Sequence, residues 1–491
     1  MKNLKKKIIQ NLNDSLDKKE LDLLEKAFDF ADKSHSEQKR QSGEPFINHP
    51  LRVALTISQM KLGVDAVIVG ILHDVVEDCH IPLSKIKSEF NEEVSFLVHG
   101  LTKVNRIKYK SQEEDSHAEK ENFRNMILAL AKDLRIIIIK LADRLDNMKT
   151  LWSLTPEKQK KKSLETLEIL APLAYRLGMA DIGSQLEDLA FPYAFPNEYK
   201  LTRKILGKRR EEEKDYLNKL VPLTRKKLQE NNLYPQEIKF RTKHLYSVWR
   251  KLQKEDMDIR RIYDLVAMRI IMSNVEECYA ALGIIHQMWK PVPGRFKDYI
   301  ALPKPNGYQS LHTAVFAEDG RIVEIQIRTP KMDEEAEGGI AAHWIYSSLK
   351  KTAGYKKRKK FSPPKNFYWI NQLREWQKTF YKSEDFLNAL KVDFFKDRIF
   401  VLTPKGDIID LPDGATPVDF AYQIHTAIGN QAAGAQVNGK LVPLDYKLQS
   451  GEVVEIIIKK GKRPSSSWLE FVKMNETKKR IQDALKGKKF I

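Results

Sequence analysis

The period of the hydrophobic pattern changes near residue 236, and this change most constrains the fold. Over residues 1–195, apolar residues recur at spacings of three and four, and glycine and proline are sparse, which predicts helices. Beyond residue 236, short β-rich runs such as 268–272 and 322–327 alternate with helical stretches such as 275–289. This alternation predicts an α/β domain with a mixed sheet.

The rest of the chain divides by composition. The highly charged stretch after residue 195 predicts a helical connector, because its run KRREEEK can pair opposite charges along a helix. Near the C-terminus, IFVLTPKGDIIDLP predicts a β-hairpin, and 418–427 predicts a helix. The expected segments are 1–195, a helical domain; 196–235, a helical connector; 236–350, an α/β domain; 351–390, a basic linker and helix; 391–460, a small β-rich domain; and 461–491, a basic tail.

The charge and the number of cysteines restrict the class of partner and the cellular compartment. The 491 residues include 85 Lys or Arg and 66 Asp or Glu, a net charge of +19 that favours polyanionic partners or, alternatively, reflects a solvated lysine-rich surface. Two cysteines, Cys79 and Cys278, exclude a disulfide scaffold and indicate a reducing, cytoplasmic setting. No apolar run approaches the ~20 residues of a membrane span, so no membrane is expected.

Three segments of the helical part offer metal ligands. The run ILHDVVED places four polar groups near one face of an otherwise apolar helix. A buried His–Asp pair is costly unless a charge compensates it, and a divalent metal would do so. PFINHPLRVA and IKLADRLDNM each supply one more ligand, giving a set that suits Mn, Fe or Zn, although each residue alone fits an ordinary salt bridge. The predicted ligands are His49, His73, Asp74 and Asp143, and the predicted acid/base groups are Glu77 and Asp78.

These segments, with SGEPFINHP and GLTKV, resemble the hydrolase domain of bifunctional RelA/SpoT-type enzymes, a branch of the HD phosphohydrolase superfamily. Such enzymes remove the 3′-pyrophosphate from (p)ppGpp. The resemblance implies Mn(II) on the four ligands, with Glu77 and Asp78 activating water and moving protons. It also implies nucleotide contacts from Arg40, Ser42, Asn147 and Thr150. Asp146, Val75 and Gln41 stand where the family usually has His, Thr and Lys, but the intact ligand set predicts an active hydrolase.

A basic cluster marks a second site. KFRTKHLYSVWRK gathers five basic residues around Ser247 and can bind a triphosphate. Asp264 begins a strand, and Glu324 should share a sheet face with Gln326 and Arg328. Two carboxylates facing cations suit Mg-assisted phosphoryl transfer, and the absence of a Walker A motif argues against a P-loop enzyme. For any single residue, an ordinary solvated loop or surface is the alternative.

The strings KHLYSVWRK, IYDLVAMRI, GRFKDYIALPKPNGYQSLHT, VEIQIRT and GGIAAHW resemble the RelA/SpoT synthetase domain, which transfers pyrophosphate from ATP to the 3′-hydroxyl of GDP or GTP. The resemblance implies Mg(II) on Asp264 and Glu324, a role for Glu324 in deprotonating the hydroxyl, and stacking of Tyr308 on guanine. The RFKD string at Arg295 is of the basic type seen in bifunctional members. Phe240 stands where Gly is common. Arg241, Lys243, Ser247 and Lys251 would hold ATP phosphates, and Lys297, Lys304, Asn306, Gln309 and His312 would line the acceptor side.

Residues 391–460 resemble a TGS domain, in which His425 matches a position that contacts deacylated tRNA on the ribosome; a structural lid is the alternative. Relatives usually continue into a C-terminal ACT region, which is not expected here. The expected fold class is multidomain α plus α/β: an all-helical HD-type hydrolase domain, a mixed-sheet nucleotidyltransferase-like synthetase domain and a small β-grasp TGS domain. The expected function is bifunctional (p)ppGpp synthesis and hydrolysis. A one-directional synthetase, or a ribosome- or tRNA-binding regulator with relic enzyme folds, remains the alternative.

Overall fold

The computed structural model describes residues 2–12, 16–105, 132–262, 265–304, 306–317, 319–339 and 398–486. The chain divides into two compact units, Met1–Arg374 and Glu375–Ile491. In the described ranges, no helix has both the length and the apolar character needed to cross a membrane. The predicted metal ligand Asp264 and the expected helix after the basic linker lie outside the described residues.

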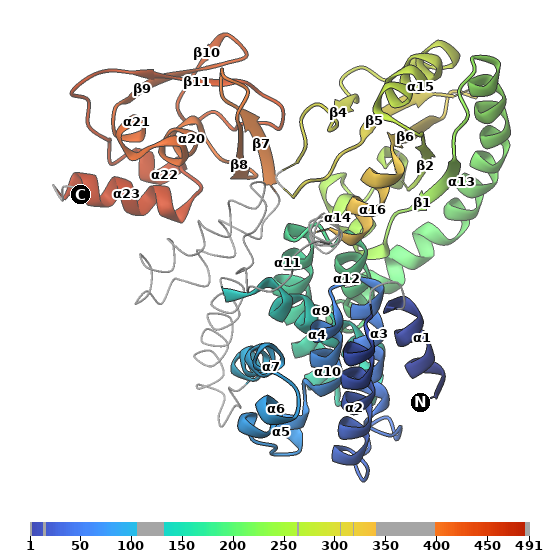
Figure 1. The fold of residues 1–491 in the computed structure, drawn as a ribbon. Helices are drawn as coiled ribbons and strands as arrows, with labels where there is room; N and C mark the ends of the chain where they lie inside the picture. The colour runs from blue at the N-terminus through green and yellow to red at the C-terminus, as the bar shows by residue number, and fades with distance from the viewer. Residues whose placement is uncertain are drawn as a thin grey trace. The chain divides into compact units, whose positions relative to one another are not determined.

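The described chain up to residue 230 is helical, as the spacing of its apolar residues predicts (Figure 1). Side-chain caps begin several helices: Asp17 and Glu20 form a capping box before α2, and Asp133 accepts the amide of Arg135 at the start of α9. The helices are α1 (Lys2–Leu12), α2 (Lys18–Ser34), α3 (Asn48–Gln59), α4 (Val64–Leu72), α5 (Val75–Asp78), α6 (Leu83–Glu89), α7 (Glu92–Asn105), α9 (Leu134–Lys149), η1 (Leu151–Ser153), α10 (Pro156–Glu165), η2 (Thr166–Leu170), α11 (Ala171–Arg176), α12 (Ala180–Ala194) and α13 (Pro196–Glu230).

Helices α3, α4 and α9 form the centre of the helical part. Residues 66–72 of α4 are all buried, and α9 is buried along most of its length, so both helices lie inside the protein. α3 packs against both of them. The three helices thereby bring His49, His73 and Asp143 towards one another.

The single helix expected over residues 71–78 is wrong, because α4 ends at Leu72 and α5 begins at Val75. His73 Nδ1 bonds the Gly70 carbonyl at 2.9 Å, the acceptor that the amide of Asp74 would use in a continuous helix. The amides of Glu77 and Asp78 then bond the Asp74 carbonyl and start a new turn. The break lies at the predicted metal ligands.

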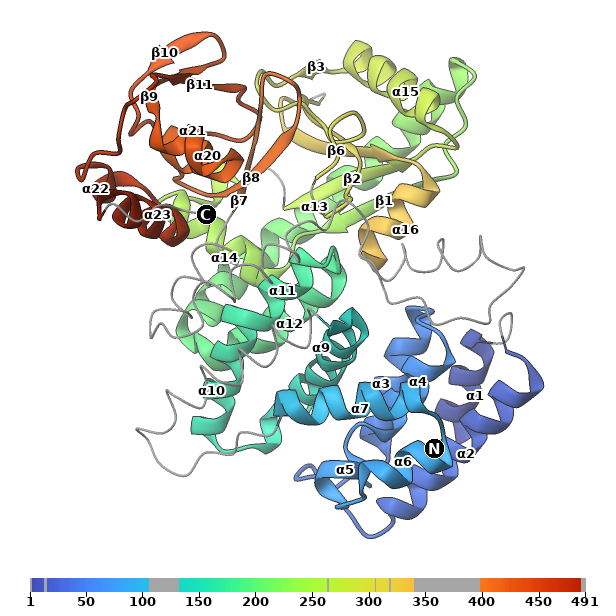
Figure 2. The same cartoon turned by 60° about the vertical axis from the view of Figure 1, so that its left-hand side comes forward.

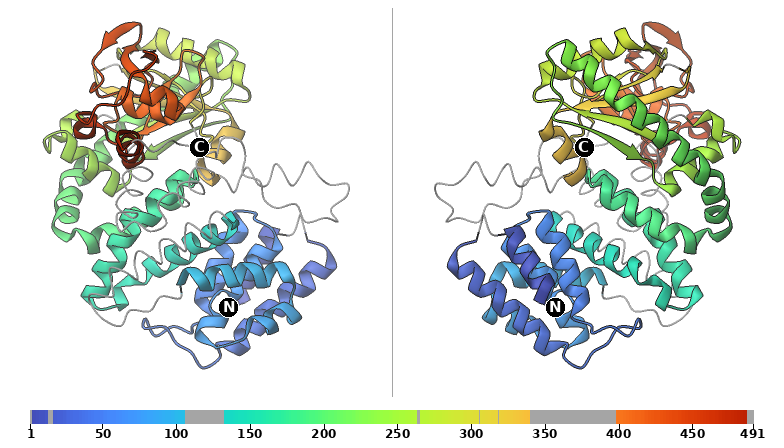
Figure 3. Two further views of the ribbon diagram at one scale, coloured as in Figure 1. Left: turned by 90° about the vertical axis from the view of Figure 1, so that its left-hand side faces the viewer. Right: turned by 90° about the vertical axis from the view of Figure 1, so that its right-hand side faces the viewer.

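A mixed sheet follows, as predicted. Its strand order is β1–β2–β6–β5–β3, with β4 also paired to β5. β2 and β6 are parallel, and the other pairs are antiparallel. α13 and α15 pack on one face of the sheet and share its apolar core (Figures 2 and 3). The elements are β1 (Glu237–Thr242), α14 (Leu245–Lys254), η3 (Ile259–Arg261), β2 (Val266–Ile271), α15 (Val275–Met288), β3 (Lys290–Pro291), β4 (Lys297–Asp298), β5 (Leu311–Phe316), β6 (Ile322–Arg328) and α16 (Pro330–Gly338).

The stretch predicted as a connector is mostly helix α13. Its residues Leu206, Leu217 and Leu220 are buried in the core of the sheet. α13 is therefore part of the wall of the α/β fold, while the residue boundaries of the predicted segments stay predictions.

Helix α12 packs against the α/β part as well as against its helical neighbours. Phe191 and Phe195 contact Trp249 of α14, with ring centroids 5.3 and 5.0 Å apart, and Tyr246 lies 5.3 Å from Phe191. Just before α12, Gly178 meets Gly339 so closely that a Cβ on Gly339 would lie 2.4 Å from the Gly178 carbonyl carbon. The helical part and the α/β part of this unit therefore meet through a close backbone contact between two glycines.

The second unit is a small two-sheet fold. β7 (Arg398–Leu402) and β8 (Ile408–Pro412) form the predicted hairpin, and a parallel bridge from Leu402 to Val453 joins it to the other sheet. The helix expected over 418–427 is wrong in extent, because His425 is extended (φ −165°) and caps a second helix. The small sheets agree with the expected TGS fold. Its other elements are α20 (Pro417–Ile424), α21 (Thr426–Asn430), β9 (Ala432–Val437), β10 (Lys440–Val442), β11 (Val454–Ile458), α22 (Trp468–Phe471) and α23 (Asn475–Leu485).

Candidate active sites

The four predicted metal ligands converge in the helical core. His49 comes from α3, His73 and Asp74 from the turn after α4, and Asp143 from α9. His49 Nε2 lies 3.3 Å from Asp143 Oδ1 and 3.5 Å from Asp74 Oδ2. His73 Nε2 lies 3.1 Å from Asp74 Oδ2 and 3.8 Å from Asp143 Oδ1. Two ring nitrogens and two carboxylates thus face one small volume.

The histidine rings are oriented as a metal site requires. Because His73 Nδ1 donates to the Gly70 carbonyl, the lone pair of that ring is on Nε2. This Nε2 is buried and has no hydrogen-bond partner in the part of the chain that the structure describes. A buried polar atom without a partner is costly, and a cation shared with the carboxylates would satisfy it. The residues therefore fit a divalent metal.

The charges of the cluster also favour a cation. Burial alone would raise the pKa of Asp143, but Lys140 and the two histidines hold it well below its usual range. Burial alone would lower the pKa of His73, but Asp74 and Asp143 hold it well above its usual range. The site thus stabilises added positive charge, which a proton or a metal can supply.

The three departures from the family pattern lie at or near this cluster. Asp146 is buried and accepts a hydrogen bond from His49 Nδ1 at 2.7 Å. Val75 is buried at the start of α5, and Gln41 lines the adjacent cavity. Of the three, Asp146 is the residue whose side chain is hydrogen-bonded to a predicted ligand within the described residues.

A cavity of about 420 Å³ opens next to Asn147, whose amide donates to Asp143 Oδ1 at 2.5 Å. The cavity wall is basic, which suits a polyphosphate. Ser42, a predicted contact, is not among the lining residues, and its Oγ is buried. The predicted contacts Arg40, Asn147 and Thr150 line the cavity with Lys39, Arg144, Lys158 and Lys162.

The predicted acid/base pair lies on α5, one turn beyond Asp74. Glu77 is half-buried, whereas Asp78 is exposed. Their amides bond the Asp74 carbonyl at 3.1 and 2.8 Å, so their backbone is fixed to the metal-ligand turn. This placement leaves their catalytic roles as predictions.

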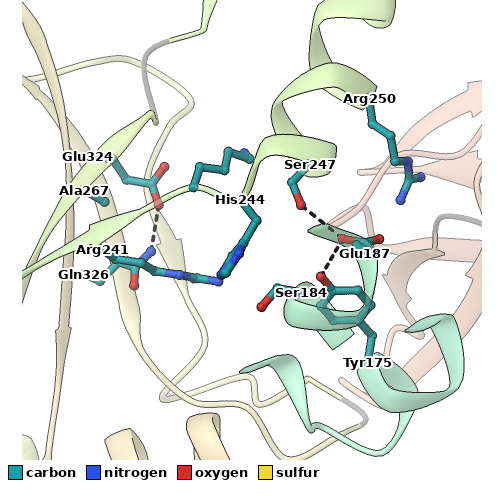
Figure 4. Close-up of a pocket in the computed structure, with 11 residues that line it drawn as sticks. Tyr175, Ser184, Glu187, Arg241, His244, Ser247, Arg250, Ala267, Glu324 and Gln326 are labelled. Carbon is teal, nitrogen blue, oxygen red and sulfur yellow. Dashed lines mark hydrogen bonds between the residues drawn. The ribbon is translucent and has the colours of Figure 1, made fainter. Parts of the chain in front are cut away.

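A second cavity, of about 200 Å³, opens on the sheet face opposite the buried core (Figure 4). β1 and α14 supply its cations, and β6 supplies Glu324 and Gln326. Lys251 is not among the lining residues. The predicted residues Arg241, Lys243, Ser247 and Glu324 line the cavity, together with His244 and Arg250.

Glu324 is held ionised. Burial raises its pKa, but hydrogen bonding to His312 and Gln326 outweighs burial and lowers it to about 2. Gln326 Nε2 donates to Glu324 Oε1 at 3.0 Å, as a shared sheet face predicts. Arg328, expected on the same face, pairs with Asp333 of α16, Nε to Oδ1 at 2.8 Å.

The acceptor-side residues form a chain of contacts that ends at Glu324. Lys304 Nζ lies 5.0 Å from the centroid of the Tyr308 ring. The Tyr308 hydroxyl lies 2.7 Å from His312 Nε2, and His312 Nδ1 lies 3.6 Å from Glu324 Oε1. Arg295 and Lys297 are exposed outside this chain.

Two further predicted residues bind backbone groups. Asn306 Nδ2 donates to the Tyr175 carbonyl at 3.3 Å, and Gln309 Nε2 donates to the Ile300 carbonyl at 3.1 Å. Both therefore shape the loop. Their contact with a nucleotide stays a prediction.

Sequence reasoning missed the helical wall of the second cavity. Tyr175, Ser184 and Glu187 come from α11 and α12, outside the segment that carries the synthetase motifs. The Tyr175 hydroxyl donates to Glu187 Oε2 at 2.8 Å, and Ser247 Oγ lies 3.4 Å from the same oxygen (Figure 4). Burial raises the pKa of Glu187 to about 7 against the effects of Tyr175 and Arg250. An acidic residue within a helical run gave no signal for this position.

Comparison with known families identifies three domains in this order. Residues 27–180 match the HD domain, residues 240–351 match the region found in RelA/SpoT proteins, and residues 399–458 match the TGS domain. These matches agree with the helical, mixed-sheet and small two-sheet parts, and they confirm the expected fold class.

Curated relatives match across most of the chain. A guanosine-3′,5′-bis(diphosphate) 3′-pyrophosphohydrolase of Aquifex aeolicus is 46% identical over 464 residues, covering 94% of this chain and 64% of the relative. A GTP pyrophosphokinase of Myxococcus xanthus is 44% identical over 467 residues (95% and 61%). The bifunctional (p)ppGpp synthase/hydrolase SpoT of Escherichia coli K12 is 41% identical over 466 residues (95% and 65%). The chain thus spans about six tenths of the length of these relatives.

Proposed function

Because the chain belongs to the RelA/SpoT family, we propose that it makes (p)ppGpp from ATP and GDP or GTP at the sheet cavity and hydrolyses it at the helical cluster. One observation is central to the proposal. Two separate sets of polar groups are assembled in the described part of the chain, and each set suits one of the two opposing reactions.

In the proposed hydrolase site, His49, His73, Asp74 and Asp143 would hold Mn(II), which polarises a phosphate oxygen and acidifies water. Arg40 and the basic wall of the adjacent cavity bind the nucleotide phosphates. Glu77 and Asp78 accept and deliver the protons of the water and of the leaving 3′-oxygen. The products are GDP or GTP and pyrophosphate.

In the proposed synthetase site, Arg241, Lys243, Ser247 and Lys251 bind the ATP phosphates. Tyr308 stacks on guanine beside Lys304, and Glu324 accepts the proton of the 3′-hydroxyl as that oxygen attacks the β-phosphorus and AMP leaves. Glu324 would hold Mg(II) with Asp264, and the metal offsets charge on the phosphates. Glu324 is ionised at neutral pH, as either role requires.

The match of residues 399–458 to the TGS domain supports an RNA partner for the second unit. We propose that the TGS domain contacts deacylated tRNA or the ribosome, with His425 as the contact residue. His425 ends α20 and caps α21, so its ring lies at a helix junction of that domain. The nucleotide substrates also favour a cytoplasmic location.

Two separate assays of the purified protein test the bifunctional assignment. The first follows release of pyrophosphate from ppGpp with Mn(II) and with chelator, and the second follows AMP formation from ATP and GDP with Mg(II). We expect Asp74→Asn to abolish hydrolysis and spare synthesis, and Glu324→Gln to do the reverse. Each variant is therefore the folding control for the other.

The alternatives give different results in the same assays. A wild-type protein active in only one direction would support the one-directional enzyme. Binding to tRNA or ribosomes without turnover in either direction would support the regulator with relic enzyme folds.

A further inference from the structure

The carboxylate of Asp146 is the centre of a buried charge network on α9. It is only 3% exposed, and three positively charged or imidazole groups surround it. Oδ2 accepts from His49 Nδ1 at 2.7 Å and from Arg40 Nη1 at 3.1 Å. Oδ1 accepts from Arg52 Nε at 2.6 Å. A buried carboxylate without such partners would be strongly destabilising.

The first consequence concerns His49. Because His49 Nδ1 donates its proton to Asp146, the lone pair of the ring lies on Nε2, which faces Asp74 and Asp143. A carboxylate behind a metal-binding imidazole fixes its tautomer and orientation and increases its basicity. His73 has only a backbone carbonyl in the corresponding place, so the two rings are supported differently.

The second consequence concerns Arg40. Asp146 and Asn147 both bond the Arg40 guanidinium, and Asn147 also bonds Asp143. Arg40 lines the basic cavity, so two chains of hydrogen bonds join this cavity residue to predicted metal ligands, one through Asp146 to His49 and one through Asn147 to Asp143. Displacing Asp146 would therefore disturb both the metal and the nucleotide side.

Arg52 compensates the negative charge of the buried Asp146 carboxylate. Its guanidinium pairs with Asp146 and also forms two bonds to Glu44, at 2.7 and 2.8 Å. Removing Asp146 and Arg52 together therefore leaves the net charge of the network unchanged. Glu44 then keeps Arg40, whose Nη1 lies 3.8 Å from Glu44 Oε1, as a neighbouring cation.

We propose that Asp146 is a positioning residue that orients His49 towards the metal and holds Arg40 in the nucleotide cavity, with Arg52 as its charge-compensating partner. The proposal rests on the hydrolase function proposed above. It explains how an aspartate serves at a position where the family pattern usually has histidine.

The test compares wild type, Asp146→Asn and the charge-balanced double variant Asp146→Asn/Arg52→Gln in the full chain. Asparagine keeps the shape and the acceptor oxygen but removes the charge. We expect the affinity for Mn(II), measured by calorimetry, to fall about tenfold or more in both variants, as for other carboxylates behind metal-bound histidines. In the electron spin-echo spectrum of bound Mn(II), the nitrogen coupling from one of two histidines should change.

The kinetic result separates the two roles of Asp146. Loss of Arg40 positioning should raise the KM for ppGpp at saturating Mn(II), beyond any change in kcat. The exposed carboxylate of Asp181, which accepts a hydrogen bond from Gln185 Nε2 at 2.7 Å, gives the control variant Asp181→Asn, which should bind Mn(II) as wild type does. Synthetase activity in each variant reports that the chain is folded.

The outcomes distinguish this role from the proposed function. Wild-type Mn(II) affinity, an unchanged nitrogen signature and unchanged KM in the folded double variant would overturn the role of Asp146 and leave the hydrolase centre intact. Absence of Mn(II) binding to the wild-type protein would overturn the proposed metal centre itself, and the role of Asp146 with it.

Discussion

Replacing Glu187 with glutamine should stabilise the protein, and only at neutral and alkaline pH. Glu187 is 3% exposed, and burial raises its pKa from 4.5 to about 7. The folded state therefore binds a proton more tightly than the unfolded state, and stability falls as the pH rises from 4.5 towards 7. The two pKa values differ by 7 − 4.5 = 2.5, and at about 1.4 kcal/mol for each pKa unit this lowers the stability above pH 7 by roughly 3.5 kcal/mol.

The variant Glu187→Gln removes this penalty and keeps an oxygen that accepts from Tyr175 and Ser247. Its unfolding midpoint should match that of wild type near pH 5 and exceed it by several degrees at pH 8. Thermal unfolding at a series of pH values measures the difference. The matched control is Glu211→Gln at an exposed position of α13, outside the cavity.

The same substitution should change the proposed synthetase reaction. Removing a carboxylate beside Ser247 and Arg250 relieves repulsion of ATP phosphates, so the KM for ATP at pH 8 should fall. A stability difference that is constant with pH, or a variant less stable than wild type at pH 8, would refute the reasoning from burial. A higher KM for ATP would show that the carboxylate helps to bind ATP.

Three further predictions follow from single positions. Burial lowers the pKa of Lys304 to about 8, so its charge is lost above that pH; the KM for the acceptor nucleotide should rise there, and Lys304→Arg should remove this rise in initial-rate assays. Gly339→Ala should lower the unfolding midpoint by forcing a Cβ against Gly178. Gly320→Ala, where φ is also positive (+77° against +58°) but the space is open, should cost only backbone strain, and equal effects would contradict the contact. Phe240 packs against the sheet core, so Phe240→Gly should destabilise the protein by about 2 kcal/mol, measured by denaturant unfolding; a neutral result would contradict that packing.

The sequence predicted the helical part, the mixed sheet and the convergence of the metal cluster, because these depend on apolar periodicity and on residue types that are costly to bury alone. It did not predict the helix break at His73 and Asp74, since a side chain bonding the Gly70 carbonyl depends on the rotamer of one ring. Nor did it predict Glu187, which approaches the cavity from α12 through tertiary packing. Asp146 was recognised as a departure, but its partner Arg52 lies on another helix, and only the fold shows that the two residues pair.

Helix α12 limits how far the helical part and the α/β part can be separated into independent domains. Phe191 of α12 and Phe195, the residue that follows its end, pack with Trp249, while Glu187 of α12 faces the second cavity. A cut in the chain after α12 would expose these rings and remove one wall of the cavity. The helical part and the α/β part therefore share helix α12 and are not joined by a flexible hinge. Selection on either of the proposed reactions would therefore act on the same helix, so the two proposed activities share a structural constraint.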